Sequence, residues 1–498
     1  MPLLMKLMMA GMALFTLIFR AYESMNIKLQ QIDNNRWLIP KHGNMHVPGM
    51  IFADNTLINQ IENDSCIKQV INVATLSGII GKSIAMPDIH SGYGFPIGGV
   101  AGFDAHDGII SPGGVGYDIN CGCRLMTTAI QTQDIYDRLG YIADALFSKI
   151  PTGVGITGYI KLNKKDLVKV STEGANWSIM QGYGDKDNLQ HIENNGVMHE
   201  ADPSVISDKA FNRGMNQLGT LGAGNHFVEL QEVTEIFDTD KANILGINVG
   251  QLTVMIHTGS RGFGHQICDD FLHGMQKIAI KNIESLPDRQ LVNVPVRSDM
   301  GRKYFAAMAC AANYAWANRQ IISHFIAEVL MKNLSVSPKE LNWKLLYDVC
   351  HNIAKMENHN GNQLVVHRKG ATRALPPFHT DLPANYKSVG QPVIIPGDMG
   401  TNSYLLAGSE KSEETFHSSC HGAGRTMSRS LAIKLGKGRA ILDELKHKGI
   451  TVRCANFKTL LEEMPDAYKN VSNVVDVIDN AGIAVKVAKL KPLVVIKG

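Results

Sequence analysis

Two side chains suited to metal binding, Asp118 and Cys121, lie three positions apart in the glycine-rich stretch GGVGYDINCGC (113–123). Glycines allow the backbone to come close to whatever such side chains hold. A carboxylate and a thiolate directed at one point suit a divalent transition metal better than a protein core. We therefore interpret this stretch as a candidate metal-binding segment.

Isolated histidines occur in four further segments, each at an expected strand end or glycine turn: LGTLGAGNHFVEL (218–230), IHTGSRGFGH (256–265), DVCHNIAK (348–355) and SSCHGAGRTMSR (418–429). One such histidine is usually a hydrogen-bonded core or loop residue. The recurrence favours a site, because polar residues on turns of a rigid scaffold are where sites are usually built. The metal-donor set that we predict is Asp118, Cys121, His226, His257 and His351. It exceeds the needs of one tetrahedral metal and suffices for two metals sharing a bridging cysteine; Mn²⁺, Zn²⁺ and Co²⁺ all suit it.

The HGAGR segment (421–425) predicts different chemistry. Its glycines would expose backbone N–H groups at the start of a helix expected over 425–436, which is a natural phosphate site. Arg425 and Arg429 could grip oxyanions or simply form a solvated helix face. His421 could be a ligand, a general base or a nucleophile toward phosphorus. Lys497 could reach a nucleobase or a phosphate, or be free, whereas Cys123, Cys350 and Cys420 fit better as small hydrophobic residues.

The elements that must position these residues mix helices and strands without a βαβ rhythm, which predicts an irregular α+β single domain over 25–498. The expected helices are 133–149 and 301–334, the latter with apolar residues at i, i+3, i+4 spacing, besides a helix and short strand over 66–87 that ends at Pro87. The expected strands are 227–232, 252–258, 390–408 and 484–497, with short strands and glycine turns over 88–124. The polar stretch 161–213 predicts an excursion of helices and loops.

The composition describes a globular chain: 498 residues, 44% hydrophobic and 19% charged, with a net charge of +3 too small to argue for a nucleic-acid partner by itself. Eight cysteines without framework spacing weakly favour a reducing compartment, and we expect a cytoplasmic protein with no membrane partner. Residues 1–24 contain an apolar run too short to span a bilayer and without a cleavage site. We expect them to be an upstream, non-native start before Met25 or an apolar leader, and we favour the former.

Taken in order, the motifs resemble those of the RtcB-type RNA ligases, the GTP-dependent tRNA-splicing and RNA-repair ligases. The resemblance extends from about residue 40 to Gly498 and includes PDIHSGYGFPIGG, GGVGYDINCG, LGTLGAGNHFVE, HTGSRGFG, His351–Asn352, RKGATRA, IIPGDMGTNSY, CHGAGRTMSR and the final Lys497–Gly498. It implies an α/β domain built around two Mn²⁺ ions. It also implies that Cys121 bridges both metals, with His257 and His351 completing one site and Asp118 and His226 completing the other.

The same resemblance implies that His421 attacks the α-phosphorus of GTP and carries GMP covalently. The positions that match guanylate contacts are Asn225, Glu229, Asn352, Ser403, Tyr468 and Lys497, together with the loop residues Asp398, Gly422, Ala423 and Gly424. Arg261, Arg425 and Arg429 match grips for RNA or nucleotide phosphates. One departure is PGDMG in place of the usual PGSMG, which puts a carboxylate at Asp398 where a serine normally meets the nucleotide.

The function implied is the joining of RNA 3′-phosphate or 2′,3′-cyclic-phosphate ends to 5′-hydroxyl ends, in tRNA splicing or RNA repair, with an archease-type activator as a possible partner. A dinuclear metal-dependent phosphoesterase acting on RNA ends would use the same donors but has no need of His421 with Lys497. A non-catalytic RNA-binding protein with a degenerate ligase fold would be expected to have lost metal donors, and all five are present.

Overall fold

Two β-sheets and a long buried helix organise the chain, whose computed structural model describes residues 29–62, 64–279 and 286–498. The predicted start at 1–24 lies outside the described residues. The mixed α+β class is confirmed: neighbouring strands pair antiparallel except in two cases, β3 with β4 and β18 with β19. Among the described residues, no helix has both the length and the apolar character needed to cross a membrane.

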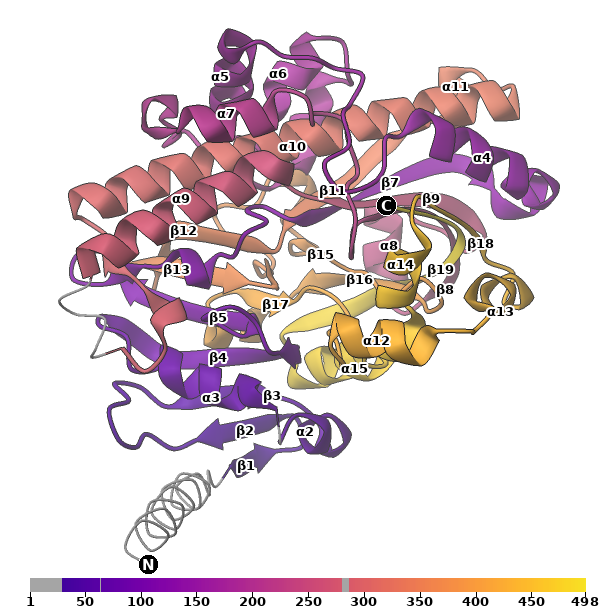
Figure 1. The fold of residues 1–498 in the computed structure, drawn as a ribbon. Coiled ribbons are helices and arrows are strands. Elements are labelled where there is room, and N and C mark those ends of the chain that lie inside the picture. The colour runs from indigo at the N-terminus through magenta and orange to yellow at the C-terminus, as the bar shows by residue number, and fades with distance from the viewer. Residues whose placement is uncertain (1–28, 63, 280–285) are drawn as a thin grey trace, which may run out of the picture.

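The first sheet lies toward the N-terminal side of the molecule (Figure 1). In spatial order its strands are β1 (Gln30–Asp33), β2 (Arg36–Ile39), β3 (Gly49–Phe52), β4 (Ile79–His90), β5 (Ile97–Asp104), β13 (Asn362–Lys369) and β12 (Asn352–His359). The predicted strand end at Pro87 is wrong, because β4 continues to His90. Pairing with β5 is irregular between Ala85 and His90, so a proline without an N–H is tolerated there.

The second sheet carries most of the segments that the sequence marked. Its strands are β11 (Lys344–Cys350), β7 (Gly122–Gln131), β9 (Gln251–Thr258), β8 (Phe227–Ile236), β19 (Ala484–Lys497), β16 (Ser403–Gly408) and β15 (Pro392–Ile395), with β18 (Thr451–Cys454) parallel to β19. The strands expected at 227–232, 252–258 and 484–497 are therefore confirmed, whereas 390–408 is two strands joined by the Pro396–Asn402 loop. Two small pairs complete the strands: β6 (Ile109–Ile110) with β10 (Val294–Pro295), and β14 (Ala371–Arg373) with β17 (Ser418–Cys420).

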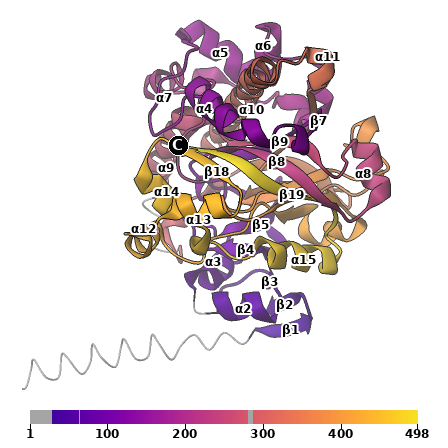
Figure 2. The ribbon, with the colours of Figure 1, turned by 90° about the vertical axis from the view of Figure 1, so that its right-hand side faces the viewer.

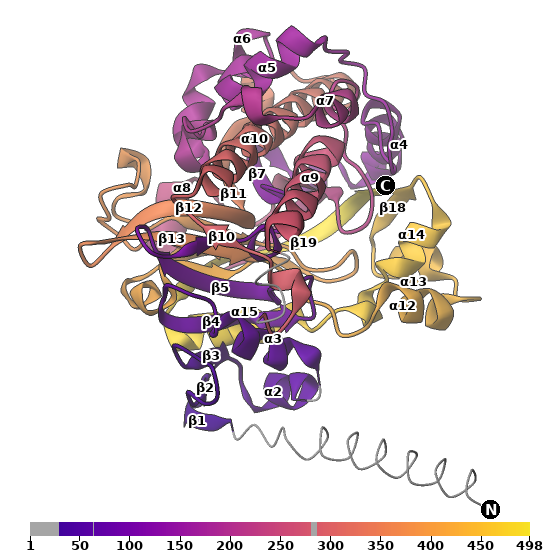
Figure 3. The ribbon, with the colours of Figure 1, turned by 60° about the vertical axis from the view of Figure 1, so that its left-hand side comes forward.

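Helix α10 (Asp299–Leu334) is the helix predicted at 301–334, and it packs on one face of the second sheet. Figure 3 shows it beside α9 (Arg261–Ala279), with the excursion helices α5 to α7 beyond it. It is buried throughout its middle because this excursion covers the side away from the sheet. The other helices are α2 (Asn55–Ile61), α3 (Ser65–Val73), α4 (Leu139–Lys149), α5 (Lys164–Glu173), α6 (Ala175–Met180), α7 (Asp208–Gly214), α8 (Thr239–Leu245), α11 (Pro338–Leu341), α12 (Arg429–Gly436), α13 (Ile441–His447), α14 (Phe457–Glu462) and α15 (Val471–Ala481).

The opposite face of the second sheet packs against the C-terminal helices α12, α13 and α14, which lie beside β18 and β19 in Figure 2. Two helix starts differ from prediction. Helix α4 begins at Leu139 rather than 133, after two 3₁₀ turns. Helix α12 begins at Arg429 rather than 425, because the Ser428 hydroxyl caps it by accepting from the Leu431 N–H. The HGAGR glycines therefore lie in a loop between β17 and α12, and not at a helix start.

Candidate active site

The five predicted metal donors converge because their strands are neighbours in the second sheet, in the order β11-β7-β9-β8. Asp118 and Cys121 precede β7, His226 precedes β8, His257 is near the end of β9, and His351 follows β11. In this antiparallel array the starts of β7 and β8 and the ends of β9 and β11 lie at the same end of the sheet. The register places Cys123 and Phe227 on either side of His257.

The donor atoms are as close as ligands of a shared metal. Asp118 Oδ2 lies 2.8 Å from His226 Nε2, and Cys121 Sγ lies 3.5 Å from the same nitrogen and 3.2 Å from His257 Nε2. The rings of His257 and His351 meet edge to face with centroids 5.4 Å apart. Burial lowers the pKa of both His257 and His351, which favours the neutral imidazole that binds metals.

In two of these imidazoles, a hydrogen bond at Nδ1 leaves Nε2 available to bind a metal. His226 Nδ1 donates to the Leu221 carbonyl at 3.0 Å, which leaves Nε2 with its lone pair toward Asp118 and Cys121. His351 Nδ1 lies 3.0 Å from Thr372 Oγ1, while its buried Nε2 has no partner among the described residues. Such orientation of one ring nitrogen by a neighbour is typical of metal-ligating histidines. Burial raises the pKa of the Cys121 thiol, and a bound cation would stabilise the thiolate.

The thiol of Cys123 also belongs to this region. Donor atoms group as Asp118, Cys121 and His226 on one side and as Cys123, His257 and His351 on the other, each within 4.8 Å. Cys123 packs in a hydrophobic cluster, as the sequence predicts, and its sulfur also lies near the donor nitrogens of both histidines. Cys121 Sγ lies within 3.5 Å of a histidine nitrogen from each group, Nε2 of His226 and Nε2 of His257.

His421 lies next to the metal donors, with its ring centroid 5.3 Å from that of His351. Its Nδ1 is 2.6 Å from Oδ2 of Asp88 on β4, and the same carboxylate oxygen accepts the His421 backbone N–H at 3.0 Å. Burial alone would raise the pKa of the Asp88 carboxyl, but His421 and its backbone N–H hold it below its usual value. Bonded through Nδ1, the imidazole keeps Nε2 available for chemistry.

Asp88 is a functional candidate that sequence reasoning missed. In PDIHSG the more conspicuous residue is His90, whose Nδ1 lies 2.9 Å from the carbonyl of Asp88. No local pattern in the sequence singles out Asp88, because its full burial on β4 and its contact with His421 arise only in the fold.

A pocket opens at His421 and takes in most of the predicted nucleotide positions. The predicted residues that line it are Asn225, Glu229, Asp398, His421, Gly422, Ala423, Gly424, Arg425, Arg429, Tyr468 and Lys497, together with His257. Two other predicted contacts, Ser403 and Asn352, are not among its lining residues. Ser403 Oγ accepts from the Gln231 amide and the Gly397 N–H, and Asn352 bridges the Asp118 carbonyl and the Gly370 N–H.

The inner end of the pocket holds two buried ionisable side chains. Burial raises the pKa of Glu229 to about 8, opposed by the amide of Gln231, which donates at 2.7 Å. Burial lowers the pKa of Lys497, opposed by Glu463 and Glu229. This end therefore offers a carboxyl and an amine that a polar ring edge could engage.

The three arginines differ in what their side chains contact. Arg261 is partly buried near Asp118, where its Nε donates to Thr220 Oγ1 at 3.2 Å. Arg425 bonds the Glu462 carbonyl at 2.8 Å and lies 3.3 Å from both Glu463 and Tyr468. Of the two alternatives for Arg425 and Arg429, a shared solvated helix face does not hold, because Arg425 lies in a loop and only Arg429 opens α12, with a largely exposed side chain.

Asp398 folds back on its own loop. Its carboxylate accepts from the Gly400 N–H at 2.8 Å and from Thr401 Oγ1 at 2.7 Å. Burial raises the pKa of this carboxyl, opposed by these two donors. The departure from the usual serine thus has a local use, in stabilising the loop at the rim of the pocket.

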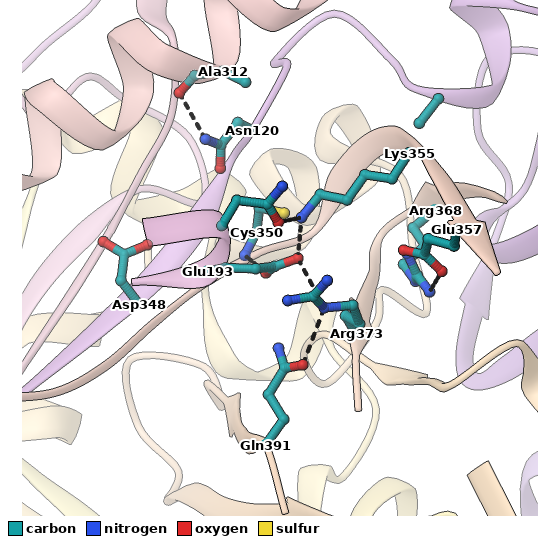
Figure 4. A network of polar contacts seen from close by, with 12 residues as sticks. Asn120, Glu193, Ala312, Asp348, Cys350, Lys355, Glu357, Arg368, Arg373 and Gln391 are labelled. Atoms are coloured by element: carbon teal, nitrogen blue, oxygen red, sulfur yellow. Dashed lines mark hydrogen bonds and ion pairs between the residues drawn. The ribbon is translucent and has the colours of Figure 1, made fainter. Parts of the chain in front are cut away.

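A second buried network connects the 161–213 excursion to the metal donors (Figure 4). Glu193 accepts from the backbone N–H of Cys350, the residue before His351, at 3.0 Å. It also pairs with Lys355 and with Arg373, whose Nε bonds Gln391 at 3.1 Å. Burial would raise the pKa of Glu193, but the two cations hold it at about 2. The excursion, which had no recognisable landmarks, therefore supports the site through one carboxylate.

A buried oxygen, nitrogen and sulfur donor cluster beside a histidine-headed pocket is the candidate site of a metal-dependent enzyme. A family model described as tRNA-splicing ligase RtcB matches residues 69–498, and the chain belongs to this family. A tRNA-splicing ligase RtcB of Thermococcus kodakarensis is 48% identical over 95% of this chain and 99% of its own length. Another from Methanococcus maripaludis is 49% identical over 91% and 95%, and an RNA-splicing ligase RtcB homolog 1 of Entamoeba histolytica is 48% identical over 89% and 86%.

Proposed function

We propose that this chain is an RNA ligase of tRNA splicing or RNA repair that joins 3′-phosphate or 2′,3′-cyclic-phosphate ends to 5′-hydroxyl ends. The observation that carries the proposal is His421, held through Nδ1 by Asp88, at the mouth of a pocket and beside His351. This arrangement suits an imidazole nucleophile that needs a free Nε2 and an adjacent cation.

In the proposed first step, Nε2 of His421 attacks the α-phosphorus of GTP. A nitrogen–phosphorus bond forms, the bond to the β-phosphate oxygen breaks, and pyrophosphate leaves. The imidazolium that develops is stabilised by Asp88. Glu229 and Lys497 at the inner end of the pocket would bind the guanine, with Asn225 and Tyr468 along its walls.

The later steps act on RNA. A cyclic end is first hydrolysed to a 3′-phosphate, which accepts GMP from His421; the 5′-hydroxyl of the second strand then attacks and expels GMP. Asp118, Cys121, His226, His257 and His351 would hold two Mn²⁺ ions, which supply charge neutralisation and orientation at phosphorus. Arg261 and Arg429 would contact phosphates, whereas Arg425 would act by fixing Glu463 and Tyr468.

The decisive experiment incubates the protein with α-³²P-GTP and Mn²⁺. An acid-labile, base-stable labelled protein is expected for wild type and for His106→Ala, an exposed histidine far along the chain, and not for His421→Ala. Absence of label from wild type with every divalent metal would exclude the ligase. Phosphate release from RNA 3′-ends without joining would instead support the phosphoesterase.

The same proposal places the enzyme in the cytoplasm, where it would use GTP to act on RNA ends. An archease-type activator is a further predicted partner. Joining of synthetic RNA ends with and without such a protein tests it.

A further inference from the structure

Two adjacent polar residues in the middle of α10, Asn318 and Arg319, are fully buried among apolar neighbours. Burying an amide and a guanidinium is costly unless every polar atom is bonded. Their partners are backbone groups and side chains of the segments that carry the metal donors, and not other helices.

Arg319 uses all five of its N–H groups. Nη1 donates to the carbonyls of Asn120 at 2.8 Å and Thr258 at 2.9 Å, which are the neighbours of Cys121 and His257. Nη2 donates to Asn120 Oδ1 at 3.0 Å, and Nη2 and Nε both bond the carboxylate of Asp348, three residues before His351. One planar fork therefore contacts three of the donor segments at once.

Asn318 contacts the remaining donor segment. Its Oδ1 accepts from Gly219 at 2.7 Å and Thr220 at 3.1 Å, and its Nδ2 donates to the Thr220 carbonyl at 3.0 Å. The next residue, Leu221, provides the carbonyl that orients Nδ1 of His226. Through this turn the amide fixes the position of that imidazole.

Asn120, which accepts from Arg319, also has an unusual backbone conformation. It adopts a left-handed backbone with φ of 51°, and its amide Nδ2 donates to the carbonyl of Ala312 on α10 at 2.7 Å (Figure 4). This conformation turns the chain between Asp118 and Cys121 so that both side chains reach His226. Helix α10 therefore holds the turn from two sides, through Ala312 and Arg319.

We propose that Asn318 and Arg319 are positioning residues of the metal centre, which set the relative places of all five donors. This inference rests on the proposed function, because it concerns the same site. Outer-shell partners of metal ligands typically change metal affinity by about 10- to 100-fold when they are mutated.

The test measures Mn²⁺ binding by titration calorimetry, thermal unfolding, and the thiolate-to-metal absorption of the Co²⁺-loaded protein. Arg319→Lys keeps the positive charge and leaves Asp348 paired with Arg124, but an ammonium has three N–H donors and cannot replace the five of the planar guanidinium. Asn120→Gly keeps the left-handed turn and removes only the side-chain bonds. Both variants are expected to weaken Mn²⁺ binding by about 10-fold or more and to alter the Co²⁺ spectrum.

The matched control is Asn313→Ala on the same helix. Asn313 is equally buried and makes three hydrogen bonds, but its partners are Ser171 and Met198 of the excursion. This variant is expected to lose thermal stability and to bind Mn²⁺ like wild type. Unchanged Mn²⁺ binding in Arg319→Lys and Asn120→Gly, or an equal loss in Asn313→Ala, would overturn the positioning role. If Arg319→Lys does not fold, Asn120→Gly decides, and a wild type that binds no Mn²⁺ would overturn the proposed function itself.

Discussion

The carboxylate of Asp88 accepts a hydrogen bond from the backbone N–H of His421 and lies 2.6 Å from Nδ1 of its ring. One oxygen atom, Oδ2, makes both contacts, so the main chain and the imidazole are fixed together. Asp88 comes from the first sheet and His421 follows β17, which places the two far apart in the chain. Their contact orients the ring toward the pocket.

Asp88→Asn is expected to abolish most transfer of GMP to His421, because an amide can present its N–H to Nδ1 and so favour the wrong tautomer. The loss should be of the order of 100-fold or more, as for misoriented imidazoles elsewhere. Formation of the labelled protein from α-³²P-GTP measures it. Asp64→Asn is the control, since Asp64 caps α3 near the site without touching His421.

Cys121→Ser and Cys123→Ser should separate the two thiols near the metal donors. Cys121 Sγ is within 3.5 Å of both His226 and His257, whereas Cys123 belongs only to the group with His257 and His351. We expect Cys121→Ser to lose Mn²⁺ binding by more than about 10-fold and Cys123→Ser to change it by less than about threefold. Calorimetric titration with Mn²⁺ decides, and the reverse order would make Cys123 the ligand.

Glu229→Gln should change how stability depends on pH. The pKa of Glu229 is about 8 in the fold against 4.5 for an ordinary carboxyl. Between these values the unfolded chain is ionised and the folded chain protonated, so this carboxyl lowers the free energy of unfolding as pH rises from 4.5 to 8. The slope is at most about 1.4 kcal/mol per pH unit and vanishes outside that window.

The stability of Glu229→Gln relative to wild type is therefore expected to rise between pH 4.5 and 8 and to level off above it. Thermal melts across this range measure the difference, with Glu235→Gln at an exposed position of the same strand as control. A difference that does not vary with pH would contradict the protonated carboxyl. Glu229→Gln should also reduce the preference for GTP over ATP, measured as the ratio of the two affinities.

Asp398→Ser restores the residue usual in this loop. Because the Asp398 carboxylate is engaged by Gly400 and Thr401, we expect it not to repel the nucleotide. GTP affinity should change by less than about threefold, equivalent to about 0.7 kcal/mol. Asp398→Ala, which removes both bonds, should weaken GTP binding more; a large gain in Asp398→Ser would show that the carboxylate faces the phosphates.

Strong periodicity and glycine-bounded strands were predictable from the sequence. The apolar spacing of 301–334 corresponds to α10, and the short strands at 227–232 and 252–258 are β8 and β9. The motifs also placed His421 together with Glu229 and Lys497, and the structure puts all three around one pocket.

What could not be predicted depends on tertiary contacts. The glycine turn before Arg425 predicts a helix that starts there. Instead, the Arg425 side chain bonds the Glu462 carbonyl and the Glu463 carboxylate, and Ser428 caps a helix that begins at Arg429. Asp88 has no local pattern that distinguishes it from an ordinary strand residue. Asn318 and Arg319 interrupt an apolar helix without any sequence signal of what they bond, because their partners are distant along the chain.

The place of β19 in the second sheet has a consequence for folding during synthesis. The donor-bearing strands β11, β7, β9 and β8 are contiguous in the sheet and all leave the ribosome before residue 360. β19 is the strand that joins β8 to β16, so the edge of β8 stays unpaired until residues 484–497 emerge. The half with the candidate metal donors can thus assemble early, while the pocket at His421 is completed only by Lys497 at the far end of β19. During that interval an open strand edge is exposed, and unpaired edges favour pairing with other chains.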